Sequence, residues 1–540
     1  MSIRWRVCDA FEWLYPDLEP AGEEGGNIVL EAASGTYAGC QLWWDGVTAG
    51  TKVEWMFQSG ASSEDGSLLE CCSLYELRSV RVEENTGPDY STVPVGTDAP
   101  YTTRPAPFRV YDALKPIGSS FLTGPEGMAL YVCWHIPEMI RPGTHTGALR
   151  LTIGSDNISI PVRIGVHGAV VPSAGSLSVT NWFSLSNIAK WHGLELWSEP
   201  FWEMTAKYGE AMRRARQTHF LVGMELTDIR RSDEGRYEFG FAKAERLIRM
   251  FLKLGFTRIE GGHLAGRNGW DDLRFVLSYD RSVMATGPEG AAFLSQYLKA
   301  WRTFLDSNGW LALTAQHIAD EPIAESAEDY RVLSGIFRKW MPGVPLIDAV
   351  IHPELDGALD IWVPTNRDFE RHMADYERLR DYGDEVWFYT CWNPGGYYLN
   401  RFLDLPLLKT RYLHWGNYLY GLNGYLHWGF NYCLKGQDPF ESNNPMLAPG
   451  VHGKRVPAGD THIVYPGDDG PWLSMRLEAM RMGVEDYELL RMAAARKPDL
   501  ADEIVGSCMT SFAEVELSIS HFKQAYRRLL KAASGTDAIG

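Results

Sequence analysis

The chain has no apolar run long enough to cross a membrane and only modest positive charge. A membrane-spanning helix needs roughly 18 consecutive apolar residues, and no stretch approaches that length. The 51 Lys and Arg residues are outnumbered by 69 Asp and Glu residues, which gives a net charge of −18. Binding to a phosphate backbone depends on clustered cations, so this balance disfavours nucleic acid. We expect neither a membrane nor a nucleic-acid partner.

Cysteine and known metal motifs are also sparse. The eight cysteines are scattered, and the one adjacent pair, Cys71 and Cys72, lacks the spacing of zinc ligands. No zincin motif is present. We therefore expect free thiols, no metal site and no cofactor. The first residues, MSIRWRVCDAFEWLYP, lack the apolar stretch and cleavage site of a secretory signal, which predicts a cytoplasmic protein.

What the chain does have is length and aromatic side chains. With 540 residues it is too long for one core, so two or three domains are expected. Aromatics make up 12% of the residues, including 20 Trp, and their flat apolar faces suit packing against sugar rings.

Residues 1–172 have the pattern of an antiparallel β-sandwich domain. Short alternating runs such as NIVLEAA and TKVEWMFQ are separated by Gly, Asp, Asn and Ser. Residues 147–168 read as a hairpin around the turn GSDN. Residues 84–107, rich in Pro and Thr, are expected to form a long loop and the most mobile part of the domain.

From about residue 176, strand-like runs alternate with amphipathic helical stretches, several of which end in Gly. The runs cover residues 176–183, 218–223, 255–262, 311–319, 345–350, 358–364, 385–392 and 424–432. Eight strands with intervening helices predict a (β/α)8 TIM barrel over residues 173–497. The remaining residues, 498–540, are expected to form a helix that packs on the barrel.

Active sites of such barrels form at the carboxyl ends of the strands, and the fourth run ends in two adjacent acids, Asp320 and Glu321. Burying two carboxylates is costly unless they have partners, which suggests a function. Asp-Glu-Pro is also an ordinary helix start, with Asp as cap and Pro in the first turn. The same rule makes further residues candidates: Asn181, Trp182, His263, Asp348, Tyr389, Trp392, Trp428 and Asn431.

Several stretches resemble glycoside hydrolase family 123 and its wider relatives with a DUF4091-type catalytic domain. They are EAASGTYAGCQLWW, PGTHTGALRLTI, DIWVP, VWFYTCW and, most specifically, VYPGDDGPWLSMRLEAMRMGVEDYELL. The resemblance spans residues 27–495. It implies a β-sandwich followed by a (β/α)8 barrel and a β-N-acetylgalactosaminidase activity. The family's adjacent Asp-Glu pair matches Asp320 and Glu321.

The resemblance also implies substrate-assisted catalysis, in which the substrate's 2-acetamido oxygen attacks the anomeric carbon. Glu321 would protonate the leaving oxygen and later activate water, and ionised Asp320 would accept the acetamido N–H. Among the expected substrate-binding residues, Tyr389 would donate to the acetamido carbonyl. Trp392 and Trp428 would stack on the sugar, and Asn181, His263 and Asn431 would complete the pocket.

Other polar residues are expected to be structural. We assign His317 and Asp348 to this group in the first instance. Charged residues of the last motif are expected to pair across the barrel wall, namely Arg476, Glu478, Arg481, Glu485 and Asp486.

Three readings stay open. The first is a retaining exo-β-N-acetylhexosaminidase acting on an oligosaccharide or glycoside. The second is a glycosidase for a sugar without an acetamido group, with Asp348 as a second carboxylate. The third is a non-catalytic carbohydrate-binding protein. The sequence leaves both a monomer and a homo-oligomer open.

Overall fold

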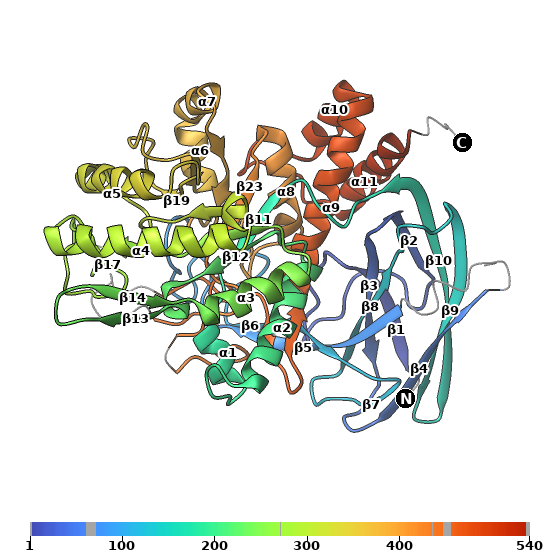
Figure 1. The fold of residues 1–540 in the computed structure, drawn as a ribbon. Helices are drawn as coiled ribbons and strands as arrows, with labels where there is room; N and C mark the ends of the chain where they lie inside the picture. The colour runs from blue at the N-terminus through green and yellow to red at the C-terminus, as the bar shows by residue number, and fades with distance from the viewer. Residues whose placement is uncertain (1–2, 61–71, 270–271, 435, 447–454, 536–540) are drawn as a thin grey trace.

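The computed structural model describes residues 3–60, 72–269, 272–434, 436–446 and 455–535 (Figure 1). Its N-terminal region forms two sheets of mainly antiparallel strands, and two strands from late in the chain extend the first of them. The first has the order β1 (Arg4–Asp9), β3 (Tyr37–Asp45), β8 (Met128–His135), β5 (Cys72–Val82), β6 (Phe108–Pro116), β25 (Pro471–Ser474) and β24 (Tyr465–Pro466). The second has the order β2 (Ile28–Ser34), β10 (Asp156–Val170), β9 (Gly143–Ile153), β4 (Lys52–Ser59) and β7 (Ser120–Leu122).

The two sheets share one core, to which Leu42 and Leu130 of the first and Val53 and Leu149 of the second contribute. This is the packing of a β-sandwich. The predicted hairpin is present, since β9 and β10 pair antiparallel from Ile153 and Asp156 onwards. The expectation of wholly antiparallel pairing was wrong for β2, which pairs parallel with β10. Strands this far apart in the chain are free of the antiparallel constraint that a tight turn imposes.

Residues 83–107 form the predicted long loop between β5 and β6, with one isolated bridge from Thr86 to Thr92. The buried Asp404 holds this loop. Its Oδ2 accepts hydrogen bonds from the Thr86 amide at 2.6 Å and from Asn85 Nδ2 at 3.2 Å, and its Oδ1 accepts one from the Thr86 hydroxyl at 2.7 Å. These contacts argue against the expected mobility at this end of the loop.

Each of the eight predicted runs contains a short parallel strand, and the run 385–392 contains two. They form three sheets, β11 (Ser178–Asn181), β23 (Gly424–His427) and β22 (Phe388–Tyr389); β12 (His219–Val222), β15 (Arg258–Gly261) and β18 (Thr314–Gln316); and β19 (Ile347–Val350), β20 (Ile361–Pro364) and β21 (Glu385–Val386). Backbone contacts link these sheets. They include the parallel bridges Gln316–Leu346 and Thr365–Tyr389 and a 3.0 Å bond from the Thr218 amide to the Val179 carbonyl.

The fourth run is shorter than predicted, because Leu311–Leu313 form a 3₁₀ helix and only Thr314–Gln316 are a strand. The chain leaves the preceding helix through a turn in which Gly309 has φ +73°. The amide of Leu313 then bonds back to the Trp310 carbonyl at 2.9 Å, so the tight turn continues before the chain extends. Leu311 and Leu313 are therefore only partly buried, contrary to the prediction of a buried strand.

The helical stretches that end in Gly are as predicted. They are α3 (Ala242–Lys253), α4 (Pro288–Ser307) and α5 (Ala327–Trp340). The glycines that follow, Gly255, Gly309 and Gly343, have φ of +96°, +73° and +83°, which a side chain would disfavour.

Other elements complete the chain. The helices are α1 (Leu185–Trp191), α2 (Glu199–Arg214), α6 (Asn366–Arg371), α7 (Met373–Asp381), α8 (Leu407–Tyr420), α9 (Met475–Arg496), α10 (Pro498–Cys508) and α11 (Ile519–Ser534). Two small hairpins are β13 (Asp228–Arg231) with β14 (Tyr237–Gly240), and β16 (Ala265–Gly266) with β17 (Val276–Leu277). None of the helices in the described ranges combines the length and apolar character of a membrane span.

Helix α9 lies between the parallel strands and the sandwich (Figure 1). Its charged residues form ion pairs, as expected, and all of them are buried, namely Arg476, Glu478, Arg481, Glu485 and Asp486. Arg476 pairs with Asp112 of β6 at 2.9 Å, and Glu478 pairs with Arg214 of α2 at 2.7 Å. The helix thus joins the two parts of the molecule.

The thiols agree with the sequence prediction where the structure describes them. Cys8, Cys40, Cys133, Cys391, Cys433 and Cys508 are free cysteines. Cys71 lies outside the described residues.

Candidate active site

The acid pair Asp320 and Glu321 follows β18 at its carboxyl end, where the chain bends away from the sheet. Glu321 has φ +47°, a left-handed conformation that is uncommon for a residue with a side chain. Its amide donates to the Ala349 carbonyl at 3.1 Å, and its carbonyl accepts from Arg267 Nη2 at 3.1 Å. Side chains alternate along a strand, so two adjacent acids can face one pocket only where the chain bends. Strain of this kind is concentrated at functional sites.

Both carboxyl groups of the pair are held toward their protonated forms. Burial raises the pKa of Asp320, and the charge of neighbouring Glu321 raises it further. Burial also raises the pKa of Glu321, against the lowering effect of a hydrogen bond from the Tyr389 hydroxyl. That hydroxyl donates to Glu321 Oε1. The pair can therefore retain a proton at a pH where exposed carboxyl groups have lost theirs.

A buried network supports the pair from β15, β18 and β19. His317 Nδ1 lies 2.9 Å from Asp348 Oδ1, and His317 Nε2 lies 3.2 Å from Glu260 Oε2. Burial opposes the charged form of His317, but the hydrogen bonds and charges of Asp348 and Glu260 prevail and raise its pKa to about 9. His317 is thus an imidazolium between two carboxylates at neutral pH.

Asp348 also fixes the backbone that leads to the acid pair. Its Oδ2 accepts hydrogen bonds from the amides of Ile318 at 2.9 Å and Ala319 at 3.1 Å, and from the Tyr330 hydroxyl at 2.5 Å. His317 and Asp348 are expected from the sequence to be structural, and both are buried and bonded to the protein directly before the catalytic candidates. Asp348 is also among the predicted strand-end residues, and His317 is not.

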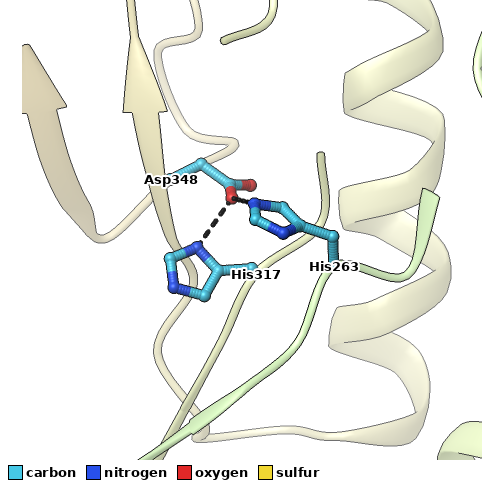
Figure 2. A group of neighbouring side chains, drawn as sticks. All are labelled: His263, His317 and Asp348. Atoms are coloured by element: carbon cyan, nitrogen blue, oxygen red, sulfur yellow. Dashed lines mark hydrogen bonds and ion pairs between the residues drawn. The ribbon is translucent and has the colours of Figure 1, made fainter. Parts of the chain in front are cut away.

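His263, His317 and Asp348 come close together (Figure 2), and their ligand atoms lie within 4.8 Å of one another. His263 Nε2 is 3.7 Å from Asp348 Oδ1. Burial and the charge of His317 lower the pKa of His263 to about 3, so it is neutral. A metal ion would have to displace the proton that joins His317 to Asp348, because both nitrogens of His317 are already hydrogen-bonded. The arrangement favours an ionic hydrogen-bond network over a metal centre.

Aromatic side chains surround the strand ends. Trp182, Trp392 and Trp428 are partly buried against a core that includes Tyr389. Trp182 Nε1 donates to Glu260 Oε2 at 3.0 Å, and Trp428 Nε1 donates to Asp460 Oδ2 at 3.1 Å. A cavity of about 460 Å³ opens beside Trp182 and Trp428; its lining also includes Trp197, Glu225 and Tyr432.

Two predicted substrate-binding residues are fully buried and bonded to the protein. Asn181 Oδ1 accepts from Arg401 Nη1 at 2.8 Å, and its Nδ2 donates to Gln217 Oε1 at 3.2 Å. Asn431 Oδ1 accepts from the Ser184 amide at 2.8 Å, and its Nδ2 donates to the Ser184 carbonyl at 3.1 Å. Both side chains thus bond to other residues around the site, and neither is exposed to solvent.

Adjacent carboxyl groups with raised pKa values at a strand end, among tryptophans, form the kind of site that glycosidases use. The family model "Glycoside hydrolase 123, catalytic domain" matches residues 182–493. The chain belongs to glycoside hydrolase family 123. It is a glycosidase, and its substrate is a carbohydrate.

One solved structure has the same fold. A family 123 glycoside hydrolase from Clostridium perfringens, studied for glycolipid glycan hydrolysis, has a TM-score of 0.73 at 13% identity, covering 99% of this chain and 98% of that one. Weaker matches include Bacteroides uniformis β-glucuronidase 3, with a TM-score of 0.31, 8% identity and coverage of 85% and 51%. Thermobacillus composti GH10 xylanase has a TM-score of 0.33, 10% identity and coverage of 57% and 96%. No curated protein matches the sequence.

Proposed function

We propose that the protein is a retaining exo-β-N-acetylhexosaminidase, most specifically a β-N-acetylgalactosaminidase, that uses substrate-assisted catalysis. The observation that carries this proposal is the adjacent pair Asp320 and Glu321 at the bend after β18. A retaining enzyme that supplies its own nucleophile needs two carboxyl groups about 5 Å apart on opposite sides of the sugar. Two neighbouring residues suit a reaction in which the substrate supplies the nucleophile.

Glu321 acts as the general acid. Its proton passes to the glycosidic oxygen as the bond from that oxygen to C1 breaks, while the acetamido oxygen forms a bond to C1 and gives an oxazolinium ion. In the second half Glu321 takes a proton from water as the water oxygen attacks C1, and the acetamido group is regenerated. The raised pKa of Glu321 suits an acid that must keep its proton near neutral pH.

Asp320 accepts the acetamido N–H and stabilises the positive charge that develops on the acetamido group. For this role it must be ionised while Glu321 is protonated, so the pair works with one shared proton. Tyr389 donates to Glu321 in the structure. When Glu321 takes up its proton, the tyrosine hydroxyl is free to turn to the acetamido carbonyl.

The second reading, with Asp348 as nucleophile or base, loses support. Asp348 is fully buried, and its two oxygens accept hydrogen bonds from His317, Tyr330 and two backbone amides. A nucleophile needs an oxygen open to the anomeric carbon. The family membership in turn removes support from a purely binding role.

We further propose that the three parallel sheets are parts of one (β/α)8 barrel spanning residues 173–497, after a sandwich of residues 1–172 and before the C-terminal helical segment of residues 498–540. The two bridges and the Thr218–Val179 hydrogen bond support this, because they join the sheets at their adjoining edges. Within the barrel range, β24 and β25 leave the barrel and extend the first sheet of the sandwich, where β25 pairs with β6. In such a barrel the acid pair would lie at the catalytic face.

The test is hydrolysis of aryl β-glycosides of N-acetylgalactosamine, N-acetylglucosamine, galactose and glucose by the purified protein. Turnover confined to the 2-acetamido sugars and inhibited by a thiazoline mimic of the oxazolinium ion is expected. Equal turnover of sugars without the acetamido group would overturn the proposal.

A further inference from the structure

The long loop of the sandwich, residues 83–107, reaches the catalytic strands. The Gly395 amide donates to the Asp89 carbonyl at 3.0 Å, and the Gly396 amide donates to the Gly87 carbonyl at 3.0 Å. A Cβ atom on residue 395 would lie 2.0 Å from the Gly87 carbonyl oxygen, so only glycine permits this approach. The loop therefore packs closely, backbone against backbone, on the segment that follows Trp392.

Tyr90, at the tip of this loop, is fixed against the site and yet open to solvent. Its ring centroid lies 6.4 Å from that of Trp392, edge to face at 67°. The guanidinium of the buried Arg367 lies 5.5 Å from the Tyr90 ring and pairs with Asp89 at 3.0 Å. Tyr90 nevertheless keeps 48% of its surface exposed. An exposed aromatic ring that is held in place by its neighbours is a platform for a flat ligand.

Tyr389 and Trp392 connect this platform to Glu321, the proposed general acid. Tyr389 bonds to Glu321, and Trp392 follows Tyr389 by three residues. The start of α6, which carries Arg367, lies here too, because Thr365, the N-cap of α6, forms a parallel bridge with Tyr389. A general acid lies next to the oxygen that it protonates, so the leaving group departs past these residues.

We propose that Tyr90 and Trp392 form the subsite for the sugar on the leaving-group side of the cleaved bond. The inference rests on the proposed function, because it takes Glu321 as the acid. Trp392 borders the cleaved sugar, and Tyr90 extends the aromatic wall outward to the apolar face of the next ring. The sandwich thereby contributes directly to the choice of glycan.

The experiment compares two substrates of one sugar, an N-acetylgalactosaminyl β-fluoride, which has no leaving-group sugar, and a β-linked N-acetylgalactosaminyl-galactose disaccharide. The variants are Tyr90→Ala, Tyr90→Phe and, as a matched control, Tyr382→Ala, which removes an exposed tyrosine of another region. We expect Tyr90→Ala to lower the ratio of kcat/KM for the disaccharide to kcat/KM for the fluoride by about tenfold, the effect of one aromatic contact. Tyr90→Phe and Tyr382→Ala should keep the parental ratio.

The outcomes separate the two proposals. If the parent cleaves both substrates and Tyr90→Ala leaves the ratio unchanged, the proposed function stands and the subsite is wrong. An equal loss on both substrates would make Tyr90 a structural residue and would also overturn the subsite. If the parent cleaves neither substrate, the proposed sugar is wrong and the subsite, which depends on it, falls too.

Discussion

His317 Nδ1 lies 2.9 Å from Asp348 Oδ1, and this contact joins β18 to β19 directly behind the acid pair. Asp348 uses its other oxygen to hold the amides of Ile318 and Ala319, two residues and one residue before Asp320. The bend that turns Asp320 and Glu321 toward the site is therefore set by a buried ionic contact.

Replacing Asp348 by Asn tests this positioning role. The Asn side chain has an NH2 group in place of one carboxylate oxygen, and this group would face the N–H and O–H donors that now bond to Asp348. At least one of these buried donors therefore loses its acceptor. We expect unfolding free energy to fall by about 1–3 kcal/mol and kcat to fall by more than KM changes. Denaturant unfolding and steady-state kinetics measure the two effects. The control is Asp356→Asn, at an exposed position after β19.

A second variant of Asp348 distinguishes a positioning role from a role as the nucleophile. If Asp348 were the nucleophile, azide would restore turnover in Asp348→Ala by taking its place at C1. We expect no rescue by azide, because a buried residue that holds the backbone is not replaced by an anion in solution. Formation of a glycosyl azide by this variant would contradict the positioning role.

Glu321→Gln removes the proposed acid while keeping its shape. General acid catalysis contributes about 10²–10⁴-fold, and we expect a loss of that size in kcat/KM on glycosides with a poor leaving group. The loss should shrink for a good leaving group such as a nitrophenolate, which needs little protonation. Rates of both substrates, measured beside the exposed control Glu325→Gln, check this pattern. A uniform loss on all leaving groups would argue against the acid role.

The pH profile of kcat/KM should reflect the shared proton of the acid pair. Burial raises both pKa values, so activity should persist above the range of ordinary carboxyl groups and fall when the pair loses its last proton. The charge of Glu321 raises the pKa of Asp320, and the repulsion between two neighbouring carboxylates is mutual, so Asp320→Asn removes this repulsion from the pair. The alkaline limb should therefore move to lower pH, by about one unit. An alkaline limb that does not move would show that the two groups titrate independently.

Local patterns predicted much of this molecule. The eight short strands and the glycines after α3, α4 and α5 were visible because alternation, helical period and left-handed glycine conformation depend on neighbouring residues. The pair Asp320 and Glu321 was found because two acids at the end of an apolar run are unusual.

Contacts between distant residues could not be read from those patterns. Arg476 and Asp112 are separated by 364 positions, so nothing near either residue tells that both are buried. Asn181 ends β11 and Asn431 lies at the end of a predicted strand, as active-site residues do. Their amides nevertheless bond to Arg401 and to the Ser184 backbone, partners that only the folded chain brings close. Tyr90 belongs to a loop of the sandwich, and its approach to Trp392 depends on how the two parts of the chain dock.

The pair Arg476–Asp112 should make a large contribution to the stability of the docked molecule. Both side chains are fully buried, and Asp112 also accepts a bond from the Tyr465 hydroxyl at 2.6 Å. Arg476→Ala would leave a buried carboxylate without its counter-ion, which costs about 3–5 kcal/mol. The control Arg491→Ala removes an exposed arginine of the same helix and should cost less than about 0.5 kcal/mol.

A double variant separates the charge from its surroundings. Arg476→Met with Asp112→Leu removes both charges together, so it should recover part of the stability lost in Arg476→Met alone. Denaturant unfolding of the parent, the single variants and the double variant gives the coupling energy. If the double variant is as unstable as the sum of the single variants, the two residues act independently, and the junction of α9 with β6 depends on other contacts.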